Sequence, residues 1–315
     1  MANVKTCDVQ QVKKKPNPIL RDLRRNSSIY TLLIPVIVFY IVFWLKPLYG
    51  IIIAFKNFSP GKGIIGSPWI GFQHFETFFK DPYFWRILKN TLNISVNNLV
   101  WSFPAPIILA ILMNELKGKW FPRVTQLVVY LPHFISMVVI CGLVERFTAQ
   151  NGIIVQFMEL FGFEPKTLLN YPEYFVPIYV ISGLWAGIGW NSIVFLAALT
   201  GIDQSLYEAA AVDGAGRMRQ TWHITLPGIL PTIVTMLLLS LGNIMSVGYE
   251  KIILLYRPIT YETADVISSY SYRKGLLEGN FGYSTAVGMF NSIINYILIT
   301  VSNKLSNKLA GQGLW

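Results

Sequence analysis

Six long apolar runs constrain this chain more than any other feature. An apolar run of roughly 17–25 residues can cross the hydrocarbon of a bilayer as a helix. Lipid offers no partner to backbone N–H and C=O groups, so a spanning segment of this length must be helical. The runs cover approximately residues 29–53, 92–115, 125–147, 174–199, 228–248 and 284–303. They predict an all-α polytopic membrane protein with six transmembrane helices.

Composition agrees with a membrane protein. Hydrophobic residues make up 53% of the 315 positions, charged residues only 13%, and the mean hydropathy is +0.47. A soluble domain carries about a quarter charged residues. Several runs contain proline, which should kink each helix or lie near its end. These prolines are Pro35, Pro104, Pro106, Pro132 and Pro177.

The distribution of Lys and Arg predicts the orientation of the spans. With the N-terminus inside, more than half of the 26 basic residues fall in cytoplasmic segments: Lys5, Lys13, Lys14, Lys15, Arg21, Arg24, Arg25, Lys117, Lys119, Arg123, Arg217, Arg219, Lys304 and Lys308. Six spans also return the C-terminus to the inside. We therefore predict a basic cytoplasmic tail over 1–28, a six-helix domain over 29–315, and longer outer segments at about 54–91, 148–173 and 249–283.

The net charge of +10 could suit nucleic acid, but many basic residues border apolar spans, so a membrane explains them better and we expect no nucleic-acid partner. Cys7 lies in the tail and Cys141 inside a span, so we expect no disulfide. The histidines at 74, 133 and 223 are scattered, and we predict no metal site. Gly61-Lys62 lacks the other residues of a phosphate-binding loop, so we expect no ATPase site on this chain.

The segment between the fourth and fifth runs, about residues 200–227, is polar and punctuated by glycine. Glu208-Ala-Ala-Ala-Val-Asp-Gly214 is followed by Ile224-Thr-Leu-Pro227. Asp203 or Ser205 could cap a short helix that runs to about Val212. Gly214 suits a turn with positive φ after that helix. Pro227 suits the first turn of the next helix.

This segment resembles the EAA motif of permease subunits in binding-protein-dependent ABC importers. That motif reads Glu-Ala-Ala, three residues, Gly, nine residues, then Ile-x-Leu-Pro. Further stretches resemble the oligosaccharide and polysaccharide-fragment branch of these permeases, the lipoprotein-associated sugar permeases: Phe103–Ala110, Leu131–Ser136, Trp222–Ile229, Gly248–Tyr256, Tyr261–Val266 and the ending Gly313–Trp315.

The resemblance implies the type I importer fold and a multi-pass protein of the bacterial cytoplasmic membrane, with both termini in the cytoplasm. It implies a heterodimer with a second, similar permease, two cytoplasmic ATPase subunits and an external solute-binding protein. It implies no enzyme activity and no cofactor here, with ATP and Mg on the ATPase subunits. The loop residues that would couple to an ATPase are Glu208, Ala209, Ala210, Asp213, Gly214, Ile224, Leu226 and Pro227.

Polar side chains within the spans are candidates for a substrate path, because polar groups in a membrane are costly. They are Asn97, Asn98, His133, Asn191, Asn243, Asn291 and Asn295. Each could instead hold neighbouring helices together by hydrogen bonds. Aromatic faces and amides together suit a sugar, and the residues we select on that ground are Trp185, Trp190, Asn191, Asn243, Tyr249 and Glu250. The tryptophans could equally face lipid.

A basic cluster in the last outer segment comprises Lys251, Arg257, Arg273 and Lys274. It would suit an acidic oligosaccharide, and it would equally suit the binding protein or lipid headgroups. The main reading is therefore an oligosaccharide importer subunit. The alternatives are a permease for another nutrient, a gradient-driven carrier, and a membrane scaffold. A carrier would usually show two related halves and intramembrane acidic groups; the sequence shows no repeat, and its predicted spans are nearly free of Asp and Glu.

Overall fold

The structure is a computed structural model that describes residues 22, 25–118, 120–310 and 313. Most of the predicted basic tail, Lys119, and Leu314 and Trp315 of the sugar-permease ending lie outside the described residues. The described part is built from helices, with one isolated antiparallel bridge between Lys56 and Trp69. The chain divides into two compact units, residues 1–52 and 53–315.

The first unit contains one long apolar helical segment. The helix α2 (Ser27–Tyr40) continues through the π-helical turn η1 (Ile41–Leu45) and α3 (Lys46–Leu48) into η2 (Tyr49–Phe55), a 3₁₀ stretch that reaches the second unit. Pro35 lies inside α2, and none of the residues of α2, η1 or α3 is buried. A helix that is apolar all round suits lipid. The candidate span Ser27–Phe55 confirms the first predicted run.

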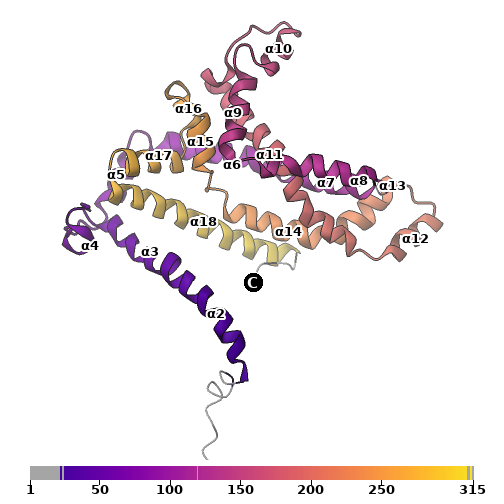
Figure 1. Cartoon of the computed structure of the whole chain (residues 1–315), viewed down its shortest axis with the longest axis horizontal. Coiled ribbons are helices and arrows are strands. Elements are labelled where there is room, and N and C mark those ends of the chain that lie inside the picture. Colours follow the sequence, from indigo (N-terminus) through magenta and orange to yellow (C-terminus); the bar gives the residue numbers. More distant parts are fainter. Residues whose placement is uncertain (1–21, 23–24, 119, 311–312, 314–315) are drawn as a thin grey trace, which may run out of the picture. The chain divides into compact units, whose positions relative to one another are not determined.

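The second unit carries five more candidate spans, and its helices are drawn in Figure 1. The spans are Phe84–Asn114, Met137–Glu159, Pro172–Thr200, Arg217–Gly242 and Phe281–Lys308. Its helices are α4 (Gly63–Gly66), α5 (Gln73–Lys80), α6 (Phe84–Ser102), α7 (Pro104–Asn114), α8 (Trp120–Tyr130), η3 (Leu131–Phe134), α9 (Met137–Thr148), α10 (Ile153–Glu159), η4 (Leu168–Asn170), α11 (Pro172–Thr200), α12 (Gln204–Val212), α13 (Arg217–Gln220), η5 (Thr221–Thr225), α14 (Leu226–Gly242), α15 (Tyr249–Leu255), η6 (Pro258–Thr260), α16 (Tyr261–Ala264), α17 (Ile267–Tyr272), η7 (Arg273–Leu277) and α18 (Phe281–Ala310).

The helix α11 is the centre of the second unit. It packs against α6, α7, α8, α14 and α16, while α14 also packs against α18. Gly189 lets α8 approach closely, because a Cβ at this position would lie 2.2 Å from the carbonyl oxygen of Val129. Close approach through small residues is a common way for membrane helices to associate.

Buried apolar side chains gather near both ends of this unit. Close to the loop between α11 and α13 lies a group that we call the loop-end cluster, made of Ile107, Ala110, Phe195, Leu199, Ile202 and Ile229. A second group, near α5 and α17, contains Phe78, Phe84, Ile87, Met245, Ile267, Tyr270, Tyr283 and Val287. In Figure 1, α12 lies at one end of the unit, and α5 and α17 lie at the opposite end.

Two predicted spans differ from the structure. The run predicted over 92–115 begins earlier, at Phe84, and its helix is interrupted at Phe103, where Pro104 begins α7. The run predicted over 125–147 is not one helix. It breaks at η3, which contains Pro132, and Ser136 then caps α9 by accepting from the Val139 amide at 3.4 Å. The candidate span shifts to Met137–Glu159, because proline removes a helical N–H and crowds the preceding turn.

The fifth run also begins earlier than predicted. Pro227 lies in the first turn of α14, as predicted, but helical structure is already continuous from Arg217 to Gly242. Pro227 follows the π-helical turn η5, in which the Leu226 amide donates to the Thr221 carbonyl. A wider turn of this kind accommodates a ring that has no N–H to donate. The fourth and sixth runs are confirmed by α11 and α18, the latter longer than predicted.

Candidate functional site

The short helix α12 forms as the sequence predicts. Asp203, not Ser205, is its N-cap, and a carboxylate oxygen of Asp203 accepts from the Ser205 amide at 2.9 Å. This backbone hydrogen bond, together with one from the Ser205 side chain, lowers the pKa of Asp203. A capping carboxylate satisfies a backbone donor that the first helical turn leaves free. The cap therefore fixes where α12 begins.

Gly214 ends α12 in the predicted conformation. Its φ is +75°, and the next amide, that of Ala215, donates to the Ala210 carbonyl at 2.8 Å. Glycine adopts this left-handed conformation without the steric cost that a Cβ would bring. The turn reverses the chain, so that α13 can begin at Arg217.

The residues of the motif differ in how far they are exposed to solvent. Ile224 and Leu226 are partly buried and pack against the loop-end cluster. Tyr207 joins α12 to η5, since its hydroxyl lies 2.9 Å from Oγ1 of Thr225. The motif residues Glu208, Ala209, Asp213, Gly214 and Pro227 are exposed, and Ala210 is half-buried.

Exposed apolar side chains accompany Glu208 on this loop. Val212 is 89% exposed, Met218 72% and Trp222 63%. Single exposed apolar residues need no explanation, but several on one loop that also exposes a carboxylate suit a protein partner. The loop's own ionic contact is weak, since Arg217 lies 3.6 Å from Glu115 and both side chains are exposed.

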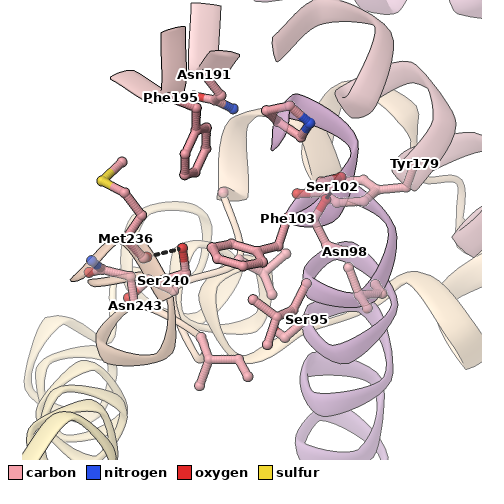
Figure 2. Close-up of a pocket in the computed structure, with 17 residues that line it drawn as sticks. Ser95, Asn98, Ser102, Phe103, Tyr179, Asn191, Phe195, Met236, Ser240 and Asn243 are labelled. Carbon is pink, nitrogen blue, oxygen red and sulfur yellow. Dashed lines mark hydrogen bonds between the residues drawn. The ribbon is translucent and has the colours of Figure 1, made fainter. Parts of the chain in front are cut away.

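A polar cavity of about 330 Å³ lies between α6, α7, α11 and α14 (Figure 2). Asn98 comes from α6, Asn191 from α11 and Asn243 from the end of α14. The aromatic rings of Phe103, Tyr179 and Phe195 also line the cavity, along with Ser95, Ser102, Ser240 and Ser246. Amides, hydroxyls and aromatic faces therefore meet in one space between membrane helices.

Several polar groups of this cavity are available to a ligand. The hydroxyl of Ser95 is buried and has no hydrogen-bond partner within the described residues. Asn98 accepts from Ser102 at 3.1 Å through its Oδ1, and Asn243 donates to the Leu239 carbonyl at 3.2 Å through its Nδ2. Each amide keeps further donor or acceptor capacity. A buried polar atom without a partner is rare and calls for a ligand, a water or strain.

Residues 102–310 match the family model described as the binding-protein-dependent transport system inner membrane component. The chain belongs to this family. It is 39% identical, over 96% of its length and 95% of the relative's, to the polygalacturonan/rhamnogalacturonan transport system permease protein YteP of Bacillus subtilis (strain 168). It is thus a multi-pass membrane permease, and the predicted family is confirmed.

Solved structures agree with this assignment. A chain of a bacterial ABC transporter involved in the import of the acidic polysaccharide alginate superposes with a TM-score of 0.86 at 42% identity, covering 93% of this permease and 99% of that chain. A chain of a bacterial alginate ABC transporter in complex with an alginate pentasaccharide-bound periplasmic protein gives 0.86 at 40%, covering 95% and 100%. The predicted type I importer fold is therefore confirmed.

The permease brings only some of the predicted path residues together. Asn191 and Asn243 line the cavity, as does Asn98 among the wider set of polar residues. Trp190 instead stacks on His133, with ring centroids 4.4 Å apart and planes 5° apart. Trp185 lines a separate, almost wholly apolar pocket between α9, α10 and α11.

The two remaining path residues also lie outside the cavity wall. Tyr249 stacks on Tyr272 with centroids 5.9 Å apart, and Glu250 is exposed beside it. Gly248, directly before them, does line the cavity.

Sequence reasoning missed the serines of the cavity. Ser95, Asn98 and Ser102 follow one another at i, i+3 and i+7 on α6, which places them on one face of a helix. A polar stripe with this period inside an apolar run is a signal that would have found them. Tyr179 offered no such signal, because a lone tyrosine in a span is usually packed or interfacial.

The basic cluster predicted from the sequence is not a free surface. Arg257 pairs with Glu145 at 2.6 Å, Arg273 with Asp265 at 2.6 Å, and Lys274 with Glu278 at 2.8 Å. Lys251 is buried instead of outward-facing. Three of the four cations are thus neutralised by partners within the chain.

Proposed function

We propose that this permease is a subunit of an ATP-driven importer of oligosaccharides and that its polar cavity is its half of the translocation path. The observation that carries the proposal is the meeting of Asn98, Asn191 and Asn243 in one cavity among membrane helices. Sugars present many hydroxyl groups, and the amides of asparagine and the hydroxyls of serine can act both as donors and as acceptors towards them. The rings of Phe103 and Phe195 supply apolar faces for the sugar's C–H surfaces.

The substrate class rests on the relatives as well. One is named for polygalacturonan and rhamnogalacturonan transport, and the solved neighbours import alginate, at 39–42% identity. One of these neighbours was solved in complex with a periplasmic protein. We extend this to an external solute-binding protein and a second permease for the present chain.

The exposed surface of the 200–227 loop is the proposed contact for an ATPase subunit. Glu208 would face a basic group there, and Ala209 keeps the helix slim enough to enter a groove. ATP and Mg would bind on two such subunits in the cytoplasm, on the same side as both termini of this chain. Three observations support this contact: the match to the motif, the exposed carboxylate of Glu208, and the exposed apolar side chains on the same loop.

The test compares two neighbouring asparagines of α6. Asn98→Leu removes an amide from the cavity wall. Asn97→Leu is the matched control, because Asn97 does not line the cavity and donates to the backbone carbonyl of Asn93 at 2.8 Å and to its Oδ1 at 2.9 Å. The complete importer is reconstituted in liposomes, and uptake of labelled oligosaccharide is measured with ATP inside.

We expect Asn98→Leu to lower oligosaccharide uptake about tenfold, since each lost hydrogen bond to a buried ligand costs about 1–2 kcal/mol. Asn97→Leu should keep most of the wild-type rate. Equal uptake by both variants would remove the cavity from the path, and a wild-type complex that carries amino acids but no saccharide would overturn the substrate class.

A further inference from the structure

Lys251 is a buried cation without an anionic partner. Its residue surface is 6% exposed, and Nζ donates to the carbonyl oxygen of Tyr179 at 2.6 Å. The same Nζ lies 4.4 Å from the centroid of the Tyr179 ring. None of the four ion pairs among the described residues includes Lys251. A carbonyl and a ring face are its main compensation.

The fold makes specific room for this ammonium group. A Cβ at Gly183 would lie 2.9 Å from Nζ of Lys251, so a larger residue there would displace it. Burying an uncompensated charge is costly, and an apolar side chain of the same length would fill this space at lower cost. That a charged side chain occupies this costly position indicates that the charge has a function.

Few other titratable groups face Lys251 from the helices packed on α15. Cys141 comes from α9 and Tyr179 from α11, while Glu250 neighbours it on α15 itself and is exposed. On α17, Tyr270 is turned towards Asp81 and Tyr272 stacks on Tyr249. Burial lowers the pKa of Lys251 to about 8, so the side chain is mainly charged at neutral pH.

Lys251 stands directly behind the wall of the polar cavity. Tyr179, whose ring it contacts, lines that cavity, and its side chain is labelled in Figure 2. Val247 and Gly248, just before α15, line it too. The positive charge is therefore separated from a ligand by about one aromatic ring, in surroundings of low dielectric where its field is weakly screened. The carboxylate of Glu250 faces solvent, which screens its opposing field more strongly.

We propose that Lys251 selects for charge: it makes the cavity favour oligosaccharides that carry carboxylates, such as uronate oligomers, over neutral ones. This inference rests on the proposed function and names the substrate class of the same cavity. Lys251 acts through the field behind Tyr179 and does not touch the sugar, so it is a specificity-determining residue of the path.

The experiment is a competition in liposomes that hold the complete importer. A uronate oligosaccharide and a neutral oligosaccharide of equal length compete for uptake in the wild type, Lys251→Met and Lys251→Arg. Because every sample contains the same solute-binding protein, its selectivity cancels in the ratio between variants. Lys274→Met is the matched control, since Lys274 is paired with Glu278 and is away from the cavity wall.

We expect Lys251→Met to lower the preference for the uronate about tenfold, through slower uronate uptake and unchanged neutral uptake. Lys251→Arg should keep part of the preference, and Lys274→Met all of it. The wild-type preference should also fall as the pH rises through about 8, where Lys251 loses its proton, and Lys251→Met should show no such fall. The series is repeated in Cys141→Ala, so that ionisation of the Cys141 thiol cannot account for the pH dependence of the preference.

Four results would overturn the inference. An unchanged preference in Lys251→Met would show that the charge does not select, and an equal loss of uronate and neutral uptake would assign Lys251 a structural role. Neutral uptake without any uronate preference in the wild type would defeat this inference alone. Uptake of neither saccharide would defeat the proposed function and this inference together.

Discussion

The two ends of the second unit are held in opposite ways. At one end lies what we call the platform, formed by α5 and residues 249–277. Asp265 is fully buried in it, accepts from Ser269 at 2.8 Å and pairs with Arg273 at 2.6 Å. Asn90 of α6 donates to the carbonyl of Asp265 at 3.0 Å. At the other end, the 200–227 loop is tied down mainly by the hydroxyl pair of Tyr207 and Thr225 and by the apolar side chains of Ile202, Ile224 and Leu226.

Further hydrogen bonds in the platform link segments that are distant in the sequence. Asp81 accepts from Tyr270 at 2.5 Å and from Tyr283 at 3.2 Å, joining α5, α17 and α18. Burial and the Asp81 carboxylate raise the pKa of Tyr270. Burial opposes the charge of Arg273, but Asp265 more than offsets this and raises its pKa. Contacts within the chain thus hold the platform together, whereas the loop leaves much of its surface exposed.

The largest effect should come from breaking the platform's buried ion pair. Asp265→Ala leaves Arg273, whose side chain is 21% exposed, without its anion, and such a loss costs about 3–5 kcal/mol. We expect little folded protein, measured by thermal unfolding in detergent and by elution as a single species. Glu278→Gln is the control, because its pair with Lys274 is half-exposed and is worth less than about 1 kcal/mol. A wild-type melting temperature for Asp265→Ala would contradict this account of the platform.

Charge reversal in the loop should act on assembly and not on folding. Glu208→Lys changes an exposed carboxylate, so the isolated permease should melt as the wild type does. We expect its recovery with ATPase subunits to fall roughly tenfold or more, as repulsion replaces attraction at an interface. Gln204→Lys, one helical turn earlier and also exposed, is the matched control. Similar recovery for both variants would remove Glu208 from the contact.

A smaller effect is expected at the end of α12. Gly214→Ala places a Cβ on a residue with φ +75°, which costs about 1–2 kcal/mol locally, although the space around it is open. Substrate-stimulated ATP hydrolysis should fall about fivefold, with assembly largely retained. Gly216→Ala is the control, since this glycine also has open space but φ −70°. Equal activities would show that the turn tolerates another conformation.

The sequence predicts much of the loop and less of the cavity. Asp203 and Gly214 could be placed because caps and positive-φ turns depend on a few neighbouring residues. Trp190 and Asn191 are neighbours in the sequence, yet successive helical residues point about 100° apart, and only Asn191 faces the cavity. Pro132 itself signals the break in the third run, because proline disrupts a helix locally. The position of Lys251 depends on how distant helices pack, and no local pattern contains that information.

The π-helical turn at Thr221–Thr225 has a mechanical consequence. It keeps the backbone continuous past Pro227, so Arg217 beside the motif and Ser240 on the cavity wall belong to one rod of 26 residues. At about 1.5 Å per residue, that rod is nearly 40 Å long. A displacement applied at its first turn therefore enters the same continuous helix that lines the cavity at Ser240, and Pro231, inside α14, is the residue at which that helix can bend.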